Sequence, residues 1–142
     1  MKCLSIRQPW AWAILHANKD VENRTWYTGY QGPLLIHAGQ KADVAGWREF
    51  VRWHDRILPP GLLPHNLPGG VVLGVVRLVD CVDDSPSPWA EEGLWHWLLA
   101  DRIAFDEPVP WRGQLGLFDV PLAGLPPKVC AAAERAARSE RT

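Results

Sequence analysis

Strand-like segments dominate this chain, and few helical segments separate them. Apolar runs and alternating patterns predict strands at residues 2–6, 21–27, 33–38, 71–82 and 115–120, and a strand or mixed segment at 94–104. Helical periodicity predicts helices near 10–17, over 41–57 and from 127 onward, and Pro/Gly content predicts a loop over 58–70. A doubly wound sheet needs a helix after nearly every strand. The order therefore predicts an α+β fold, a small mixed or antiparallel β-barrel with flanking helices.

The composition predicts one domain with a sizeable hydrophobic core. Of the 142 residues, 47% are hydrophobic and 22% are charged, which is ordinary for a globular domain. Nine tryptophans are unusual, and we expect most of them in the core, because an indole buries a large area. Gly74 interrupts the apolar run 71–82, which predicts a bend or a close backbone approach there.

The charge of the chain is unevenly distributed. The net charge is −1, so this protein does not coat nucleic acid through bulk electrostatics. Residues 1–41 nevertheless hold five Lys or Arg and two acids, whereas residues 42–142 hold ten basic and fourteen acidic residues. We therefore expect any anion-binding surface in the N-terminal third.

Cysteine spacing and hydropathy argue against several classes of protein. Cys3, Cys81 and Cys130 are scattered thiols without CxxC spacing, which is unlike a disulfide scaffold or a zinc site. Met1-Lys2 leads straight into a strand-like pattern rather than a signal peptide. No apolar run approaches the ~18 residues that a membrane span needs. We expect a cytoplasmic protein that requires no metal, cofactor or membrane.

Charged side chains and tryptophans are crowded near the N-terminus. The stretches Leu4-Ser-Ile-Arg-Gln-Pro-Trp-Ala-Trp and Lys19-Asp-Val-Glu-Asn-Arg-Thr-Trp26 place Arg7, Lys19, Glu22 and Arg24 among three tryptophans. Indoles stack on bases and cations bind phosphates, so this pattern indicates a site for a planar, anionic ligand. The alternative is that core tryptophans lie beside a solvated, charged strand.

Four motifs, in this order, resemble those of the ASCH domain family, and in particular its stand-alone bacterial members. They are Leu4-Ser-Ile-Arg-Gln-Pro-Trp-Ala, Lys19-x-x-Glu22-Asn-Arg24-Thr-Trp, Gly32-Pro-Leu-Leu-Ile-His-Ala38 and Arg112-Gly-Gln-Leu-Gly-Leu-Phe118. The resemblance implies a PUA-like β-barrel with a cleft between barrel and helices, and a nucleic-acid or nucleoside ligand. We expect a single ASCH-like domain over residues 1–142, in which 127–142 form a terminal helix and tail.

Lys19 and Glu22 are the candidate catalytic residues, since the equivalent of Lys19 in the family lies in the cleft. A lysine that loses solvent acts as a general base, or holds an oxyanion when it is charged. Glu22 and Arg24 alternate along the expected strand and therefore share one face. The alternative for Lys19 is a cation at the C-terminal end of a helix, facing the helix dipole. If the protein is a hydrolase, loss of Lys19 should abolish turnover but cost little stability, because the residue lies near the surface end of a helix.

The candidate ligand-binding residues come from the first strand, the first helix and the second strand. Gln8 suits a base edge, and Arg7 suits a phosphate. Trp10 suits stacking on a base, although its place on the apolar helix stripe also fits a core aromatic. The whole predicted set is Ser5, Arg7, Gln8, Trp10 and Arg24.

The chain departs from the hydrolase branch of the family. That branch removes the acyl group from N4-acetylcytidine, and its proposed nucleophile is a threonine three residues after the lysine, where this chain has Glu22. Thr25 is near in sequence but faces the other side of the expected strand. A glutamate can act as a base on water, which is a different mechanism. The branch also uses a downstream glutamate, for which Glu91 and Glu92 are the candidates.

Three kinds of function follow from these observations. The first is binding of RNA or a modified nucleobase through a cationic cleft. The second is metal-independent amidohydrolase activity on N4-acetylcytidine-type nucleosides. The third is a ribonuclease, an activity proposed for other family members, or a ligand-binding regulatory module. Inside the apolar strand 33–38, His37 is expected to be a hydrogen-bonded core histidine.

Overall fold

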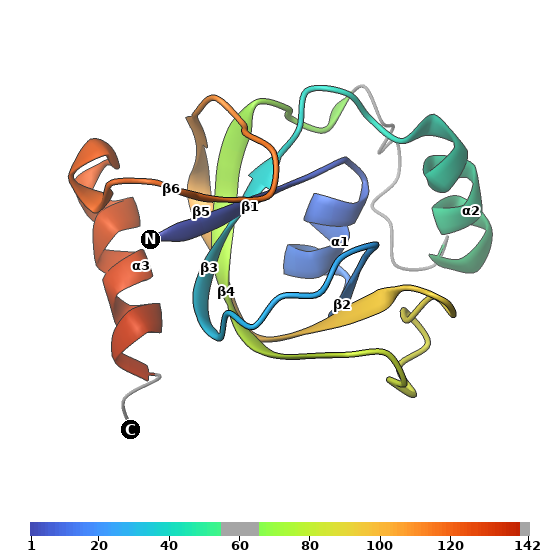
Figure 1. Cartoon of the computed structure of the whole chain (residues 1–142). Helices are drawn as coiled ribbons and strands as arrows, with labels where there is room; N and C mark the ends of the chain where they lie inside the picture. Colours follow the sequence, from blue (N-terminus) through green and yellow to red (C-terminus); the bar gives the residue numbers. More distant parts are fainter. Residues whose placement is uncertain (55–65, 140–142) are drawn as a thin grey trace.

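A curled, mixed six-stranded sheet with three flanking helices forms the molecule (Figure 1). The computed structural model describes residues 1–54 and 66–139. The strands are β1 (Lys2–Ile6), β2 (Val21–Arg24), β3 (Gly32–Ala38), β4 (Val71–Val82), β5 (Trp95–Pro110) and β6 (Leu117–Asp119). The helices are α1 (Trp10–His16), α2 (Val44–His54) and α3 (Pro127–Ser139), with a short 3-10 helix η2 (Leu122–Gly124). The sheet is a half-barrel, so the predicted α+β, PUA-like fold is confirmed.

The strand order in the sheet is β2-β5-β4-β3-β1-β6. β1 and β3 are parallel, and every other neighbouring pair is antiparallel. The long pair β4 and β5 contains three register shifts. Such bulges bend a strand and increase its twist, which is how so few strands curl into a half-barrel.

Two hydrophobic cores lie on opposite faces of this sheet. Alternate residues of β1 and β3 face α1, where Leu4 and Ile36 pack with Ile14 and Trp97. The intervening residues face α3, where Leu35 packs with other apolar side chains such as Cys3, Phe118 and Val129. Figure 1 shows α1 within the curve of the sheet and α3 against its outer face. The alternation of a strand therefore sorts the side chains of β1 and β3 between two separate environments.

The observed strands differ from the predicted ones mainly at their ends. β4 has the predicted bounds, whereas β5 continues six residues beyond the predicted 104, to Pro110. β2 ends at Arg24 rather than at residue 27, because the chain bends there and Trp26 packs on the α1-side core. The predicted helical residues 55–57, loop residues 58–65 and tail residues 140–142 lie outside the described residues.

Gly74 marks a close backbone approach, as predicted. A Cβ atom at this position would lie 2.5 Å from the carbonyl oxygen of Ile103 and 2.8 Å from Cδ2 of Leu15. β4 therefore meets β5 on one side and α1 on the other with no room for a methyl group.

We predict that Gly74→Ala destabilises the fold by about 1–3 kcal/mol, because the added methyl group overpacks a backbone contact that cannot yield easily. Urea unfolding measures this change. Gly29→Ala is the matched control, since a Cβ atom there meets nothing within 4 Å. Equal midpoints for the two variants would contradict the close approach.

Candidate functional site

The end of α1 directs Lys19 into the protein. Asn18 adopts the left-handed conformation (φ 61°), which asparagine tolerates better than most residues. The Lys19 backbone N–H then donates a 3.1 Å hydrogen bond to the carbonyl of Ala13. The turn places Lys19 directly before β2, and only 3% of its surface is exposed. The alternative of an exposed cation at the helix end is therefore wrong.

Glu22 holds two cations with its two carboxylate oxygens. Lys19 Nζ lies 3.1 Å from Oε1, and Arg24 Nη1 lies 3.2 Å from Oε2. Lys19 also donates to the backbone carbonyl of Val21. Glu22 and Arg24 share one face of β2, as their spacing predicts, and Arg24 remains 25% exposed at its side chain. The group is a buried ion network with one side open to solvent.

Two indoles flank these charges. Lys19 Nζ lies 5.9 Å from the ring centroid of Trp10, and Arg24 Cζ lies 6.0 Å from that of Trp26. Both distances fit cation–π contacts. We call Trp10, Lys19, Glu22, Arg24 and Trp26 the Lys19 cluster.

Asp43 fixes the position of Trp10. Its Oδ2 accepts a 3.0 Å hydrogen bond from Trp10 Nε1, while its Oδ1 accepts one of 2.9 Å from the Gly46 N–H. The second bond caps the first turn of α2. The sequence signal for Asp43 was present, because aspartate directly before a helix is a favoured cap, but nothing local indicated its bond to Trp10.

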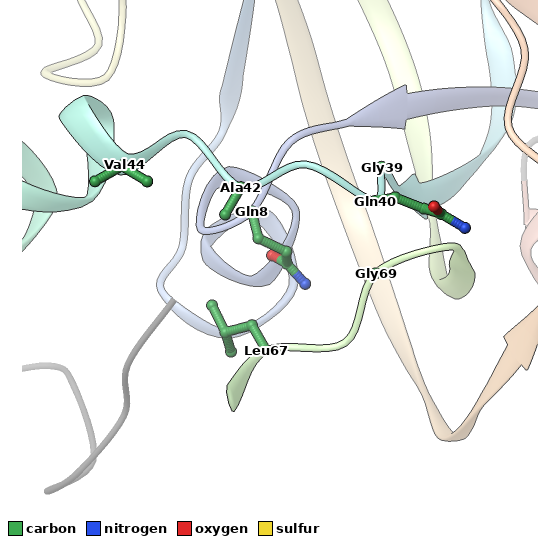
Figure 2. Close-up of a pocket in the computed structure, with 7 residues that line it drawn as sticks. All are labelled: Gln8, Gly39, Gln40, Ala42, Val44, Leu67 and Gly69. Carbon is green, nitrogen blue, oxygen red and sulfur yellow. The ribbon is translucent and has the colours of Figure 1, made fainter. Parts of the chain in front are cut away.

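Gln8 lines a pocket, but both polar atoms of its side-chain amide already make hydrogen bonds within the protein. Its Oε1 accepts from the Trp12 N–H at 2.9 Å, and its Nε2 donates to the Pro68 carbonyl at 3.0 Å. Figure 2 shows the pocket, with the Gln8 side chain between the segment after β3 and the segment before β4. The pocket has a volume of about 520 Å³ and is lined by Gln8, Gly39, Gln40, Ala42, Val44, Leu67 and Gly69.

The remaining predicted binding residues lie elsewhere. Ser5 points to the α3 side of the sheet, where it contacts His37, and Arg7 is exposed just after β1. Glu91 and Glu92 are exposed, and the Glu91 backbone N–H donates to Asn23 Oδ1. The structure thus joins Trp10, Lys19, Glu22 and Arg24 in one cluster, with Gln8, Arg7 and Ser5 at separate positions.

The described part of the chain, residues 1–54 and 66–139, contains neither a candidate membrane-spanning helix nor a candidate metal-binding group. No helix there is long and apolar enough to cross a membrane. The same residues contain no group of three or more His, Cys, Asp or Glu that is arranged to hold a metal ion.

The curled half-barrel sheet and its flanking helices place the chain among the PUA-like domains, and a buried Lys–Glu–Arg network lies at the edge of this fold. The ASCH domain family matches residues 4–108, and the chain belongs to this family. ASCH is a PUA-like family that is linked to RNA binding. The matched range contains the whole Lys19 cluster and most of the sheet.

Two similar proteins are mammalian. The chain is 34% identical over 87 residues to "Activating signal cointegrator 1" of Homo sapiens and 35% identical over 82 residues to the protein of the same name from Mus musculus. Each alignment covers 56% of this chain but only 14% of the relative. The likeness therefore concerns one segment of those longer proteins.

We predict that Lys19→Met destabilises the protein by about 3 kcal/mol, because it leaves a buried carboxylate with one of its two cations. Lys2→Met is the matched control, since the Lys2–Asp119 pair is exposed and its loss should cost less than about 1 kcal/mol. Urea unfolding of both variants provides the comparison. A Lys19→Met variant as stable as Lys2→Met would show that the buried network contributes nothing.

Proposed function

We propose that the chain binds single-stranded RNA or a modified nucleobase at the Lys19 cluster. The observation that carries this proposal is the arrangement of two cations around one carboxylate, between the indoles of Trp10 and Trp26. Aromatic rings supply stacking for a base, and cations supply attraction for a phosphate. The family's link to RNA supports the same assignment.

The charge distribution supports an anionic ligand of modest affinity. Two cations and one carboxylate leave the cluster with one net positive charge, and a partly dry site strengthens the field of that charge. Arg24 is the cation that solvent reaches, and Arg7 is an exposed cation in the same third of the chain. The overall charge of −1 limits nonspecific attraction, so binding should be weak and sensitive to salt.

We expect the double variant Arg7→Ala/Arg24→Ala to lose RNA binding, because it removes the solvent-facing cation of the Lys19 cluster and an exposed cation of the N-terminal third. Fluorescence anisotropy with a labelled, mixed-sequence single-stranded RNA at low salt measures the affinity. Arg135→Ala/Arg138→Ala, which removes two exposed cations from α3, is the charge-matched control and should bind as the unaltered chain does.

Two results would overturn this assignment. One is no binding at low salt, and the other is binding that the Arg7→Ala/Arg24→Ala change leaves intact. Binding of a nucleobase ligand that does not weaken as salt rises would favour a regulatory module, since phosphate contacts release counterions and depend on salt.

Hydrolysis of an N4-acylated cytosine nucleoside is the second candidate. The observation that favours it is the contact between two buried, oppositely charged groups, Lys19 and Glu22, which can exchange a proton. In this mechanism Glu22 takes a proton from water, the resulting hydroxide attacks the acyl carbon, and Lys19 stabilises the oxyanion. The bond from the acyl carbon to N4 then breaks, Glu22 gives its proton to the leaving N4 amine, and the carboxylic acid departs. Glu22 must first release one of its cations, because both of its oxygens are engaged.

Glu22→Thr separates the two hydrolytic mechanisms. If Glu22 activates water, this change should lower conversion of N4-acetylcytidine to cytidine by about 100-fold or more, as the loss of a general base commonly does. If the missing threonine alone prevents catalysis, the same change should create activity. Ultraviolet absorbance follows the conversion. Inactivity of both the parent and the variant would exclude the hydrolase and leave the binding proposal in place.

We also propose that residues 1–142 form one ASCH-like domain, with 127–142 as its terminal helix and tail. The support is that α3, which lies beyond the matched range 4–108, contributes Val129 and Ala133 to the core that contains Leu35 and Phe118. A helix that buries side chains against the sheet is part of the same folding unit.

A further inference from the structure

A serine and a histidine meet on the face of the sheet opposite to the Lys19 cluster. The parallel pairing of β1 with β3 places Ser5 beside His37 in register. Both residues lie one position before the ends of their strands, at Ile6 and Ala38. The carboxyl ends of neighbouring parallel strands are a common place for ligands, because the chain turns away there and leaves a crevice.

The hydrogen bonds of His37 determine which ring nitrogen carries the proton in the neutral imidazole. Its Nε2 lies 2.8 Å from the carbonyl oxygen of Trp111, which can only accept, so Nε2 carries a proton. In the neutral ring Nδ1 is therefore unprotonated, and it accepts a 2.9 Å hydrogen bond from Ser5 Oγ. A hydroxyl that donates to an oriented imidazole is the arrangement of an activated serine nucleophile, with the Trp111 carbonyl as the orienting group.

An open groove lies beside this pair. The groove has a volume of about 930 Å³, and besides Ser5 and His37 it is lined by Gly39, Gln40, Gly70, Pro110, Trp111, Arg112, Gly113, Gln114 and Leu115. Ser5 is half-buried, whereas His37 is 1% exposed, so Ser5 is the more accessible member of the pair. Arg112 and Gln114 are exposed at the groove and offer a cation and an amide to polar groups of a ligand.

The surroundings of Gly113 and Cys3 indicate that Ser5 is the nucleophile on this face of the sheet. A Cβ atom on Gly113 would lie 2.7 Å from Ser5 Oγ and 2.8 Å from His37 Cε1, so glycine lets the backbone approach the pair closely. Cys3, the other nucleophilic side chain on this face of β1, is fully buried. Burial raises the pKa of its thiol to about 12, so it forms no thiolate near neutral pH.

We propose that Ser5 and His37 form a second active site, a serine nucleophile and its base, that hydrolyses small carboxylic esters in the groove lined by Arg112 and Gln114. This site is independent of the Lys19 cluster and of the function proposed for it. The prediction that His37 is a hydrogen-bonded core histidine is confirmed by its burial and its two partners. Because His37 also lines the groove and accepts a hydrogen bond from the Ser5 hydroxyl, we assign it the additional role of general base in this proposed site.

The reaction balances with water as the only co-reactant. Ser5 Oγ forms a bond to the acyl carbon while its proton moves to His37 Nδ1, and the Trp111 carbonyl holds the resulting imidazolium. The bond to the alcohol oxygen then breaks, and His37 returns the proton to the leaving alcohol. A water molecule next gives a proton to Nδ1 and attacks the acyl carbon, so that the acid leaves and Ser5 regains its proton from His37.

Covalent labelling locates the nucleophile without any substitution. A fluorophosphonate probe should phosphonylate Ser5 of the folded, full-length chain, with loss of fluoride, and peptide mass spectrometry identifies the modified residue. Ser5→Ala should take no label. Ser87→Ala, which removes a serine hydroxyl bonded to Asp20 and outside the groove lining, is the matched control and should be labelled like the parent. No label, or a label at another residue, would overturn the proposal.

Ester hydrolysis gives the second readout. With p-nitrophenyl acetate, Ser5→Ala and His37→Gln should each lower the rate of p-nitrophenol release by about 100-fold, whereas Ser87→Ala should leave it unchanged. Because His37 is buried, the melting temperature of His37→Gln shows whether the loss reflects unfolding, and the labelling of the parent decides independently. A rate that is the same in Ser5→Ala and in the parent would show that the pair is structural.

Discussion

The parallel pairing of β1 with β3 is the constraint on which both sites depend. Its register places Leu4 beside Ile36 on the α1 side and Ser5 beside His37 on the α3 side. A shift of β1 by one residue along β3 would turn the side chains of β1 to the opposite faces, placing the Ser5 hydroxyl under α1, away from His37. The same pairing supports the surface on which α1 packs, and α1 carries Trp10 to Lys19. One ladder of backbone hydrogen bonds thus sets the chemistry of both faces.

The features that could be predicted from the sequence are those that a local pattern of residues determines, such as the extent and the faces of a strand. The bounds of β4 and the face shared by Glu22 and Arg24 follow from alternation, which is a property of neighbouring residues. The burial of Lys19 did not follow, because it depends on the left-handed turn at Asn18, and helical spacing alone leaves a lysine there exposed. The contact of Ser5 with His37 joins residues 32 positions apart, and no local pattern specifies which strands become parallel neighbours.

Glu22 changes what a lysine in this position can do. A threonine would leave the ammonium of Lys19 without a carboxylate partner, whereas the glutamate accepts from Lys19 and Arg24 together. A carboxylate between two cations makes a stable, preformed arrangement, which suits recognition of a ligand. The same stability opposes proton transfer, since the base is engaged before the substrate arrives. The engaged carboxylate is therefore an argument for the proposed binding over the proposed hydrolysis.

Asp43 makes one carboxylate serve two structures. It caps α2 with one oxygen and restrains the indole of Trp10 with the other. The space around it is full, because a Cβ atom on Gly46 would lie 2.3 Å from Asp43 Oδ2 and 2.8 Å from Cζ2 of Trp10. The start of α2 and the indole of Trp10, which lies beside Lys19, are thermodynamically linked through Asp43. A ligand that stacks on Trp10 in its present orientation would therefore also stabilise the first turn of α2. By reciprocity, a protein that binds α2 would change the affinity of Trp10 for that ligand by the same free energy.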